Sequence, residues 1–464
     1  MRREALCAAA LLACGCNAIN GIGDFVVVGD GGGVATSQGG SGGSGGAGGV
    51  VATGGGGQTN VGGGGGQGGQ GGEGGAPPMP CTDHPECPSE LCLPTGFCAE
   101  IIDVDAGSTH ACAVVSDGTL HCWGQNGNGQ LGDGTLTSHA GPEPVIGLSD
   151  VAGVTCGQRN HDSTDAHTCA FRSDGTVACW GRNDEGQCGL GNTNNPIVDA
   201  TTVLGLTGVV QLGSGRLHTC ALTDAGDVYC WGRGNNGALG LGDFSDSSFP
   251  QMVMGGVDQI AVGNDFTCAL EQAGTVMCWG RNDVFQLGQG NQLPSNLPVA
   301  VTGLSGITSL VAGQGWACAQ SGPDQVWCWG HNNDGQLGLG TNLSQSMPVE
   351  VPALTGVASL AGGLQRGDSA VQGGHTCSVG TDGSAQCWGE NNQGQLGDGS
   401  TSATSLPAAV VALSGVAELS LGGNYSCARL SGGALRCWGR NSEGQLGTGA
   451  PGGNQLTPAA VVWP

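Results

Sequence analysis

The sequence contains no lysine. All 12 of its Lys or Arg positions are Arg, against 37 acidic residues, and the formal net charge is -25. Phosphate recognition requires clustered cations, so such a chain is unsuited to nucleic acid and to anionic lipid headgroups. The missing lysine also excludes a P-loop lysine, a Schiff-base nucleophile and a Ser-Lys pair. Nucleic acid is therefore not expected among its partners.

Long apolar runs are also missing. The run at residues 5–13 follows Arg2 and Arg3, is too short to span a bilayer, and is typical of a secretory signal. It leads into Leu11-Leu12-Ala13-Cys14, which resembles a bacterial lipobox, so residues 1–16 are predicted to be a lipoprotein-type signal peptide. Lipid attachment is expected at Cys14 or, as the second candidate, at Cys16. We expect an exported protein on the bacterial outer membrane or cell surface, touching the membrane only through its lipid, or a secreted protein if the signal is an ordinary one.

Bulky residues are scarce between the signal and the first cysteine cluster. Residues 17–79 are rich in Gly with Ser, Gln and Thr, a composition that cannot bury a core and predicts a disordered linker. Residues 80–100 then hold four closely spaced cysteines without a Cys-x-x-Cys pair, which disfavours zinc. In an exported chain they predict a small module with two disulfides, in one of three connectivities. These cysteines are Cys81, Cys87, Cys92 and Cys98.

A repeat of about fifty residues fills the chain from residue 101 to 464. Its marker is Cys-Trp-Gly, followed by Gly-Gln-Leu-Gly or a near variant and then by a short Pro-x-x-Val segment. Each unit reads as four short strands between Gly-rich turns, with no helical periodicity. Seven such units predict an all-β fold, a seven-bladed β-propeller of four-stranded blades forming one domain. The marker tryptophans are Trp123, Trp180, Trp231, Trp279, Trp329, Trp388 and Trp438.

A second cysteine stands ten residues before each marker cysteine. Gly118, six residues after Cys112, fits the left-handed position of a three-residue hairpin loop. That loop makes Val115 face Thr119 and puts Cys112 opposite Cys122 in a non-hydrogen-bonded pair, with Cα atoms about 4.5 Å apart, which a disulfide tolerates. Seven cross-strand disulfides are predicted: Cys112–Cys122, Cys169–Cys179, Cys220–Cys230, Cys268–Cys278, Cys318–Cys328, Cys377–Cys387 and Cys427–Cys437.

The alternative to disulfides is a set of metal or redox thiols. The residue two before each first cysteine is His in four units, but Phe266, Trp316 and Tyr425 in the others. Since Phe cannot ligate a metal, this position is interpreted as a packing position, and no metal site is predicted. Cys156 and Cys188 fall outside the pattern within one unit. We expect them to bond to each other, the alternative being two buried free thiols.

The run His-Thr-Cys-Ala-Leu, Asp-Gly, Cys-Trp-Gly, Gly-Gln-Leu-Gly resembles the repeat of the regulator of chromosome condensation family. The resemblance covers all seven units and implies a seven-bladed propeller. It also implies candidate activities: the eukaryotic namesake exchanges guanine nucleotide on a small nuclear GTPase and binds chromatin, and secreted bacterial relatives include a protein inhibitor of β-lactamases. This chain departs from the nuclear members in its cysteine pairs, its export signal and its acidic charge.

No catalytic residues are found: the sequence has no Gly-x-Ser-x-Gly elbow and no His-Glu-x-x-His motif. The protein is predicted not to be an enzyme and to use no cofactor. Units two and six carry insertions, 158–166 and 363–371, in the same strand connection, so both should rise from one rim of the propeller. Inserted loops on a rigid scaffold commonly bind partners, although neutral drift explains them equally well. The candidate binding residues are Arg159, His161, Asp162, Gln365, Arg366 and Asp368.

The predicted function is a non-catalytic, monomeric surface protein that holds a protein or polysaccharide partner of unknown identity. The alternative is a regulator or inhibitor of another protein, of the nucleotide-exchange or enzyme-inhibitor kind. One further expectation concerns ring closure. A copy of the Pro-x-x-Val segment at residues 458–461 has no following unit, so we expect it to complete the blade begun by residues 101–123.

Overall fold

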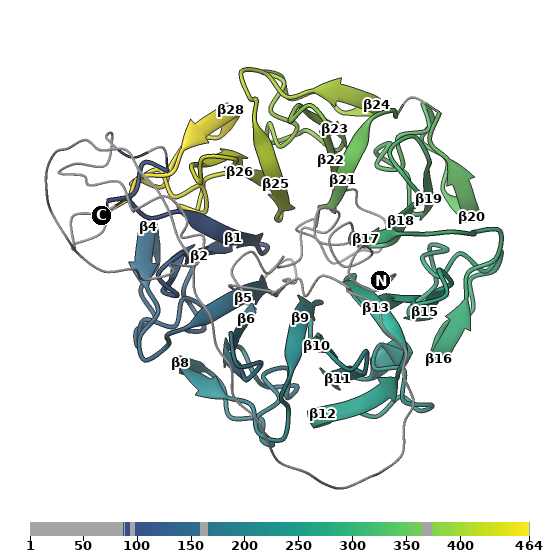
Figure 1. The fold of residues 1–464 in the computed structure, drawn as a ribbon, viewed down its shortest axis with the longest axis horizontal. Helices are drawn as coiled ribbons and strands as arrows, with labels where there is room; N and C mark the ends of the chain where they lie inside the picture. The colour runs from purple at the N-terminus through teal and green to yellow at the C-terminus, as the bar shows by residue number, and fades with distance from the viewer. Residues whose placement is uncertain are drawn as a thin grey trace, which may run out of the picture. The chain divides into compact units, whose positions relative to one another are not determined.

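The structure is a computed structural model that describes residues 87, 89–92, 98–157, 166–352, 354–363 and 374–463. Twenty-eight strands within these residues form seven four-stranded sheets, as expected for a seven-bladed propeller. Figure 1 shows the sheets arranged around a common centre. The helical structure of the described residues is a short 3-10 segment, η2 (Asn235–Gly237), and no helix there has the length and apolar character needed to cross a membrane.

Each sheet is an antiparallel meander of four consecutive strands. The first strands lie around the centre: β1 (Ile101–Ala106), β5 (Val151–Cys156), β9 (Val209–Ser214), β13 (Val257–Val262), β17 (Ser309–Ala312), β21 (Val357–Gly362) and β25 (Val416–Leu421). The second strands carry the first cysteines: β2 (His110–Val115), β6 (His167–Arg172), β10 (His218–Thr223), β14 (Phe266–Glu271), β18 (Trp316–Gln320), β22 (His375–Gly380) and β26 (Tyr425–Leu430).

The third strands carry Cys-Trp-Gly: β3 (Leu120–Gly124), β7 (Val177–Gly181), β11 (Val228–Gly232), β15 (Val276–Gly280), β19 (Val326–Gly330), β23 (Ala385–Gly389) and β27 (Leu435–Gly439). The fourth strands lie on the outside: β4 (His139–Pro144), β8 (Ile197–Thr202), β12 (Ser247–Met254), β16 (Ser295–Ala300), β20 (Gln345–Glu350), β24 (Thr404–Ala409) and β28 (Gln455–Ala460).

The hairpin between the second and third strands has the expected geometry. Gly118 adopts φ 81°, the Gly118 amide donates to the Val115 carbonyl at 2.9 Å, and the Val115 amide donates to the Thr119 carbonyl at 2.9 Å. Cys112 consequently pairs with Cys122 across the two strands. The same register recurs in every blade, and all seven predicted cysteine pairs are disulfides with Cα atoms 4.1 Å apart.

The marker tryptophans join neighbouring blades. Each is fully buried, and its indole Nε1 donates to a carbonyl in the Gln-Leu-Gly segment of the preceding blade. Trp180, for example, donates to the Gln130 carbonyl at 2.9 Å. A Cβ built on Gly132 would lie 2.8 Å from the Trp180 Nε1, so this close approach requires glycine. The six other bonds run Trp123 to Gln445, Trp231 to Gln187, Trp279 to Ala238, Trp329 to Gln286, Trp388 to Gln336 and Trp438 to Gln395.

The expected strand exchange at ring closure is wrong. β28 pairs with β27 of its own blade, and the fourth strand of the first blade is β4. Each fourth strand pairs with the third strand that precedes it, although the first strand of the next unit is nearer in the chain, so every blade is built from contiguous residues. The segment therefore belongs to the unit before it, which leaves no orphan strand at the end.

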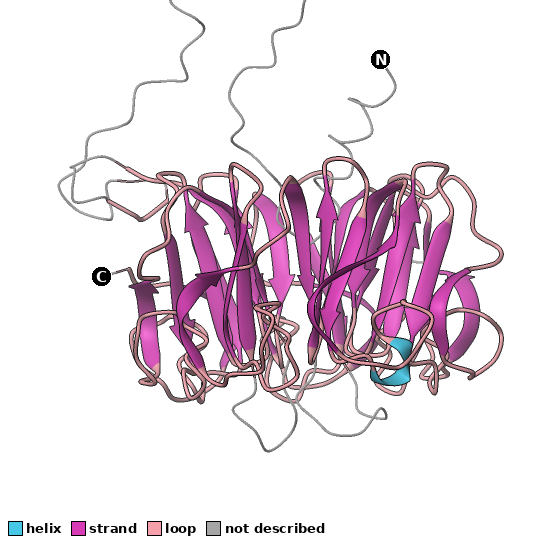
Figure 2. Ribbon diagram, turned by 90° about the horizontal axis from the view of Figure 1, so that it is seen from below, coloured by secondary structure: helices cyan, strands magenta, loops and turns pink. Residues whose placement is uncertain are grey.

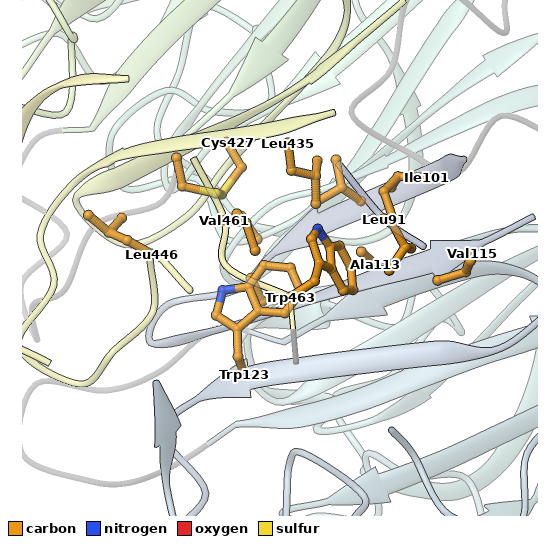
Figure 3. Packing of buried hydrophobic residues seen from close by; sticks show 14 of the residues in the cluster. Leu91, Ile101, Ala113, Val115, Trp123, Cys427, Leu435, Leu446, Val461 and Trp463 are labelled. Carbon is orange, nitrogen blue, oxygen red and sulfur yellow. A yellow bond between two sulfur atoms is a disulfide. The ribbon is translucent and has the colours of Figure 1, made fainter. Parts of the chain in front are cut away.

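Side chains close the ring instead. Trp123 of the first blade donates to the Gln445 carbonyl of the last at 3.0 Å, and the Tyr425 hydroxyl donates to the His110 carbonyl at 2.7 Å. Trp463, just beyond the last strand, packs its ring edge-on against Trp123 with centroids 6.3 Å apart (Figure 3). We call these contacts between the first and last blades the closing seam.

The described residues of the four-cysteine module pack against the closing seam. Cys87 and Cys98 form a disulfide, which excludes two of the three possible connectivities of the four cysteines. Cys92 is also disulfide-bonded. Leu91 belongs to the apolar cluster that contains Trp123 and Trp463 (Figure 3). Residues 1–16, the linker 17–79 and Cys81 lie outside the described residues, as do the lipidation candidates Cys14 and Cys16.

Candidate interaction surface

The antiparallel blades sort the strand connections onto two rims (Figure 2). Connections from first to second strands and from third to fourth strands share one rim, which we call the insertion rim. The insertions lie in the chain between β5 and β6 and between β21 and β22, and the described residues that flank them stand at this rim. The candidate residues themselves lie outside the described residues: Arg159, His161, Asp162, Gln365, Arg366 and Asp368.

A series of exposed apolar side chains follows the outer edge of the insertion rim over four consecutive blades. Leu293 and Leu343, in connections from third to fourth strands, are 73% and 70% exposed. The others are at least 45% exposed, and those in strands stand near the strand's beginning, next to the same rim. We define the apolar arc as Phe244, Phe249, Leu293, Leu297, Leu343, Met347 and Leu406. Its strands, β12, β16, β20 and β24, follow one another around the outside (Figure 1).

Backbone contacts connect the strands of the apolar arc across blade boundaries. The amide of Gly290 donates to the carbonyl of Ser346 in the next blade at 2.8 Å, and a Cβ built on Gly290 would lie 3.7 Å from the Met347 side chain. Equivalent backbone bonds link Gly242 to Asn296 and Gly340 to Ser405. The outer strands are therefore fixed to their neighbours, so the arc residues follow one edge of a rigid scaffold.

The fourth strands of the other three blades have no large apolar side chain at the equivalent position, although the first blade has an exposed leucine, Leu136, in the connection from β3 to β4. In each blade the glycine of Cys-Trp-Gly pairs with one residue of the fourth strand, and this equivalent position lies two residues after that partner. In the four blades of the arc this position holds Phe249, Leu297, Met347 or Leu406. At the same register position the remaining blades have Gly141, Asp199 and Thr457. Sequence reasoning that compared loop lengths missed the arc. The usable signal is a change of residue type at one position of the repeat.

A charged network occupies the insertion rim beside the arc. The Asp265 carboxylate lies 3.1 Å from Arg216 Nη2 and 3.5 Å from Arg281 Nη1, and Arg281 also lies 2.7 Å from Asp283. Asp265 is buried between the two guanidinium groups, which come from neighbouring blades. The network thus holds charged side chains in fixed positions next to the apolar surface.

The histidines that precede the cysteine pairs are structural, as the packing interpretation requires. His110 is fully buried, and burial lowers its pKa to about 3, so the ring is neutral. One ring nitrogen lies 2.9 Å from the Thr168 hydroxyl of the next blade, and three further bonds repeat this contact: His167–Thr219, His218–Thr267 and His375–Ser426.

The expected Cys156–Cys188 disulfide is wrong, because both residues are buried free thiols. Cys156 packs in the cluster between the first and second blades, whereas Cys188 packs in the cluster between the second and third. Their shared departure from the repeat reflects two separate packing positions. Within the described residues, ligand atoms of His110, Cys112 and Cys156 lie within 4.8 Å of one another, but the Cys112 sulfur is already bonded to Cys122.

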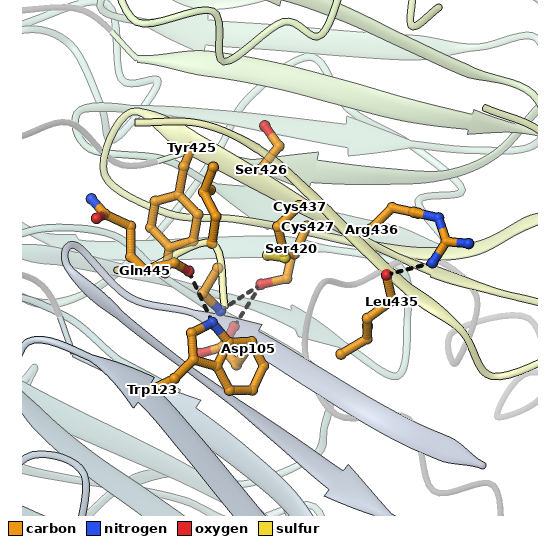
Figure 4. The surroundings of a disulfide bond; sticks show 12 residues. Asp105, Trp123, Ser420, Tyr425, Ser426, Cys427, Leu435, Arg436, Cys437 and Gln445 are labelled. Carbon is orange, nitrogen blue, oxygen red and sulfur yellow. Dashed lines mark hydrogen bonds between the residues drawn. A yellow bond between two sulfur atoms is a disulfide. The ribbon is translucent and has the colours of Figure 1, made fainter. Parts of the chain in front are cut away.

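Carboxyl groups gather at the closing seam. Asp103 accepts from the Val154 amide at 3.0 Å, and Glu418 accepts from Arg429 Nε at 2.9 Å. Burial raises the pKa of both carboxyl groups, and the neighbouring Glu418 charge raises the pKa of Asp103 further. Asp105, which accepts from the Ser420 hydroxyl at 3.0 Å (Figure 4), has its pKa raised to about 7 by burial.

The fold and its surfaces define a disulfide-stapled seven-bladed propeller with one apolar edge. The model described as "RCC1-like domain" matches residues 162–463, and models described as "Regulator of chromosome condensation (RCC1) repeat" match residues 101–130 and 117–160. The chain therefore belongs to the regulator of chromosome condensation (RCC1) family, as its repeat indicated.

Curated relatives include the ultraviolet-B receptor UVR8 of Arabidopsis thaliana, 35% identical over 157 residues, covering 32% of this chain and 33% of the receptor. The human E3 ubiquitin-protein ligase HERC2 is 33% identical over 161 residues, 33% of this chain and 3% of the ligase. The chain thus spans a third or less of these relatives.

Among solved structures, Prp20p of Saccharomyces cerevisiae superposes with a TM-score of 0.63 at 21% identity, covering 78% of this chain and 87% of that chain. Human WBSCR16 gives a TM-score of 0.60 at 24% identity, covering 70% and 85%. Prp20p is described with binding properties to Gsp1p and histones. These similarities establish the fold.

Proposed function

We propose that this protein is a non-catalytic binding protein that holds a protein partner on the insertion rim, with the apolar arc as its main contact. The arc is the observation that supports the proposal. Large exposed apolar side chains gathered along one edge are unfavourable in water, and contiguous patches of this kind mark sites of association. The Arg216–Asp265–Arg281 network lies on the same rim, where the strand connections that carry the two insertions also begin and end.

A protein partner is favoured over a polysaccharide. Sugar rings are commonly held by stacked aromatic side chains and polar groups, whereas five of the seven arc residues are Leu or Met. Aliphatic side chains bury well against the apolar core of a protein interface. Protein ligands are also described for a related propeller, since Prp20p binds Gsp1p and histones. Regulation or inhibition of another protein, the alternative function, would use the same contact.

We further propose that the protein works outside the cytoplasm, anchored by lipid at Cys14 or Cys16. Seven disulfides within the blades support an oxidising compartment, where such bonds persist. Mass spectrometry of the mature N-terminal peptide tests the anchor. A lipidated cysteine at the new N-terminus is the expected result, and an unmodified peptide beginning elsewhere would contradict the anchor alone.

The binding surface is tested with two matched variants of the full chain. The arc variant carries Leu293→Ser, Leu297→Ser and Leu343→Ser. The control variant carries Ile146→Ser, Leu204→Ser and Val411→Ser, which are also exposed but follow fourth strands and so lie on the opposite rim.

Both variants should melt like the wild type, because every substituted side chain is exposed. A cell-envelope extract is passed over each immobilised protein, and the partner retained by the wild type is identified and its Kd measured. Loss of about 1.4 kcal/mol or more of apolar contact should weaken the arc variant at least about tenfold and leave the control unchanged. Equal affinity of the arc variant and the wild type would contradict the proposed surface.

A further inference from the structure

A free thiol and a disulfide meet between the first and second blades. Cys156 is the last residue of β5, and Cys112 lies in β2, bonded to Cys122 of β3. The sulfur atoms of Cys156 and Cys112 lie within 4.8 Å of each other and of a ring nitrogen of His110. All of these residues are buried, and the Cys156 thiol donates to the Asp105 carbonyl at 3.4 Å.

This juxtaposition is particular to one blade. The last residue of the first strand is a cysteine in the second blade alone. The corresponding residues in the other blades are Ala106, Ser214, Val262, Ala312, Gly362 and Leu421. None of these side chains can react with the disulfide of the preceding blade.

We propose that Cys156 and the Cys112–Cys122 disulfide form a thiol–disulfide exchange site that can convert the bond within the first blade into a bond between the first and second blades. The Cys156 thiol loses its proton, and the thiolate sulfur attacks the Cys112 sulfur. The Cys112–Cys122 bond breaks, its electron pair passes to the Cys122 sulfur, and that sulfur takes up a proton. One disulfide and one thiol are present before and after, so no oxidant or reductant is consumed.

The surroundings of Cys156 keep the site in its resting form. Burial raises the pKa of the Cys156 thiol well above its ordinary value, and the charges of Asp105 and Asp103 on β1 raise it further. His110 on β2 is neutral because burial lowers its pKa, so it offers no positive charge to stabilise a thiolate, and burial raises the pKa of Tyr425 on β26, so its hydroxyl stays uncharged. Exchange therefore requires alkaline pH or a loss of negative charge beside the thiol.

The product would alter the contact between the first and second blades. A Cys112–Cys156 bond would tie β2 to β5 covalently, whereas the blades are otherwise joined there by packing and hydrogen bonds such as that from the Cys156 amide to the Asp105 carboxylate at 2.6 Å. It would also release a thiol at Cys122, next to the tryptophan that bonds across the closing seam.

The test uses the oxidised full-length protein, held folded at about pH 7 and about pH 10, because the thiolate fraction of a thiol with a raised pKa grows about tenfold for each pH unit below that pKa. Thiols are blocked after acid quenching, the protein is digested without reduction, and cross-linked peptides are identified by mass spectrometry. We expect a Cys112–Cys156 peptide with blocked Cys122 to accumulate at the higher pH, at a rate independent of protein concentration. Near-ultraviolet circular dichroism verifies that the fold is retained.

Three variants make the outcome decisive. Cys156→Ser should abolish the product, and Cys188→Ser, which removes the other buried thiol, should leave it unchanged. Asp105→Asn keeps a carbonyl acceptor for the Cys156 amide but removes a negative charge. If it lowers the thiol pKa by about one unit, exchange should accelerate about tenfold below that pKa. Retention of Cys112–Cys122 with blocked Cys156 at both pH values would overturn the proposal, as would a mixture in which Cys112–Cys156 is no commoner than other non-native pairs.

Discussion

Trp463 is the side chain on which closure of the ring can be tested most directly. It lies beyond β28, is only 6% exposed, and packs edge-on against His121 and Trp123 of the first blade with centroid distances of 5.6 and 6.3 Å. Its neighbour Val462 has a comparable place in the chain but is 54% exposed. Trp463→Ala and Val462→Ala therefore form a matched pair that separates packing at the seam from an effect of the chain end.

The expected loss for Trp463→Ala is about 3 kcal/mol. Removal of a buried tryptophan from a core costs about 3–5 kcal/mol, and the lower end applies because a chain end can relax into part of the vacated space. About 1 kcal/mol of the loss comes from the edge-on contacts of the ring. Val462→Ala should change stability by no more than about 0.5 kcal/mol, as exposed substitutions usually do.

Guanidinium unfolding of the oxidised full chain, followed by tryptophan fluorescence, measures both variants. Hydrogen exchange of peptides from β3 and β28 adds a local reading, because the seam should open before the disulfide-stapled blades unfold. A loss below about 1 kcal/mol for Trp463→Ala, or equal effects of the two substitutions, would refute closure by this side chain. Deletion of residues 462–464, which spares the buried Val461, should then also be harmless.

Three further predictions follow from single sites. Asp105 has its pKa raised to about 7 in the folded protein, so the stability it contributes is fully present below about pH 4 and is lost as the pH rises through 7. The denaturation midpoint of Asp105→Asn should lack that part of the wild-type decline. Gly132→Ala should lower the free energy of unfolding, measured in urea, by about 2–4 kcal/mol. The backbone of residue 132 has φ 67°, which alanine adopts with strain, and the added methyl group would clash with the Trp180 indole of the next blade. Gly147→Ala, with φ 71° and open space, should cost only about 1 kcal/mol. Thiol labelling of the unfolded, unreduced protein should modify Cys156 and Cys188 and none of the fourteen blade cysteines bonded in pairs; labelling of the pairs would contradict the disulfides.

The features that sequence reasoning predicted correctly are local in the chain. The Cys112–Cys122 register follows from a three-residue loop, because strand pairing counts outward from the turn without reference to the rest of the fold. The seven-blade count follows from the period of the repeat. Both inferences use distances of ten to fifty residues, over which the repeat itself supplies the geometry.

The incorrect predictions concern contacts between units. A repeat has no intrinsic starting point, so the sequence alone did not show whether the Pro-x-x-Val segment belongs to the unit before or after it, and β28 was assigned to the wrong blade. The pairing of Cys156 with Cys188 rested on their shared departure from the pattern. It failed because residues of one blade face two different neighbours, and these two thiols point to opposite ones.

The apolar arc can be separated from the requirements of the fold by comparing blades within this one molecule. At one register position Gly141, Asp199 and Thr457 pair their strands in the same way as Leu297 and its counterparts. The backbone of the fourth strand therefore forms equally well with a polar side chain or with none. The large apolar residues of the other blades gain little burial, since they remain at least 45% exposed, and each leaves apolar area in water at a cost of about 25 cal/mol per Å². Stability of the propeller does not account for four such residues in consecutive blades, whereas association through this edge would bury them.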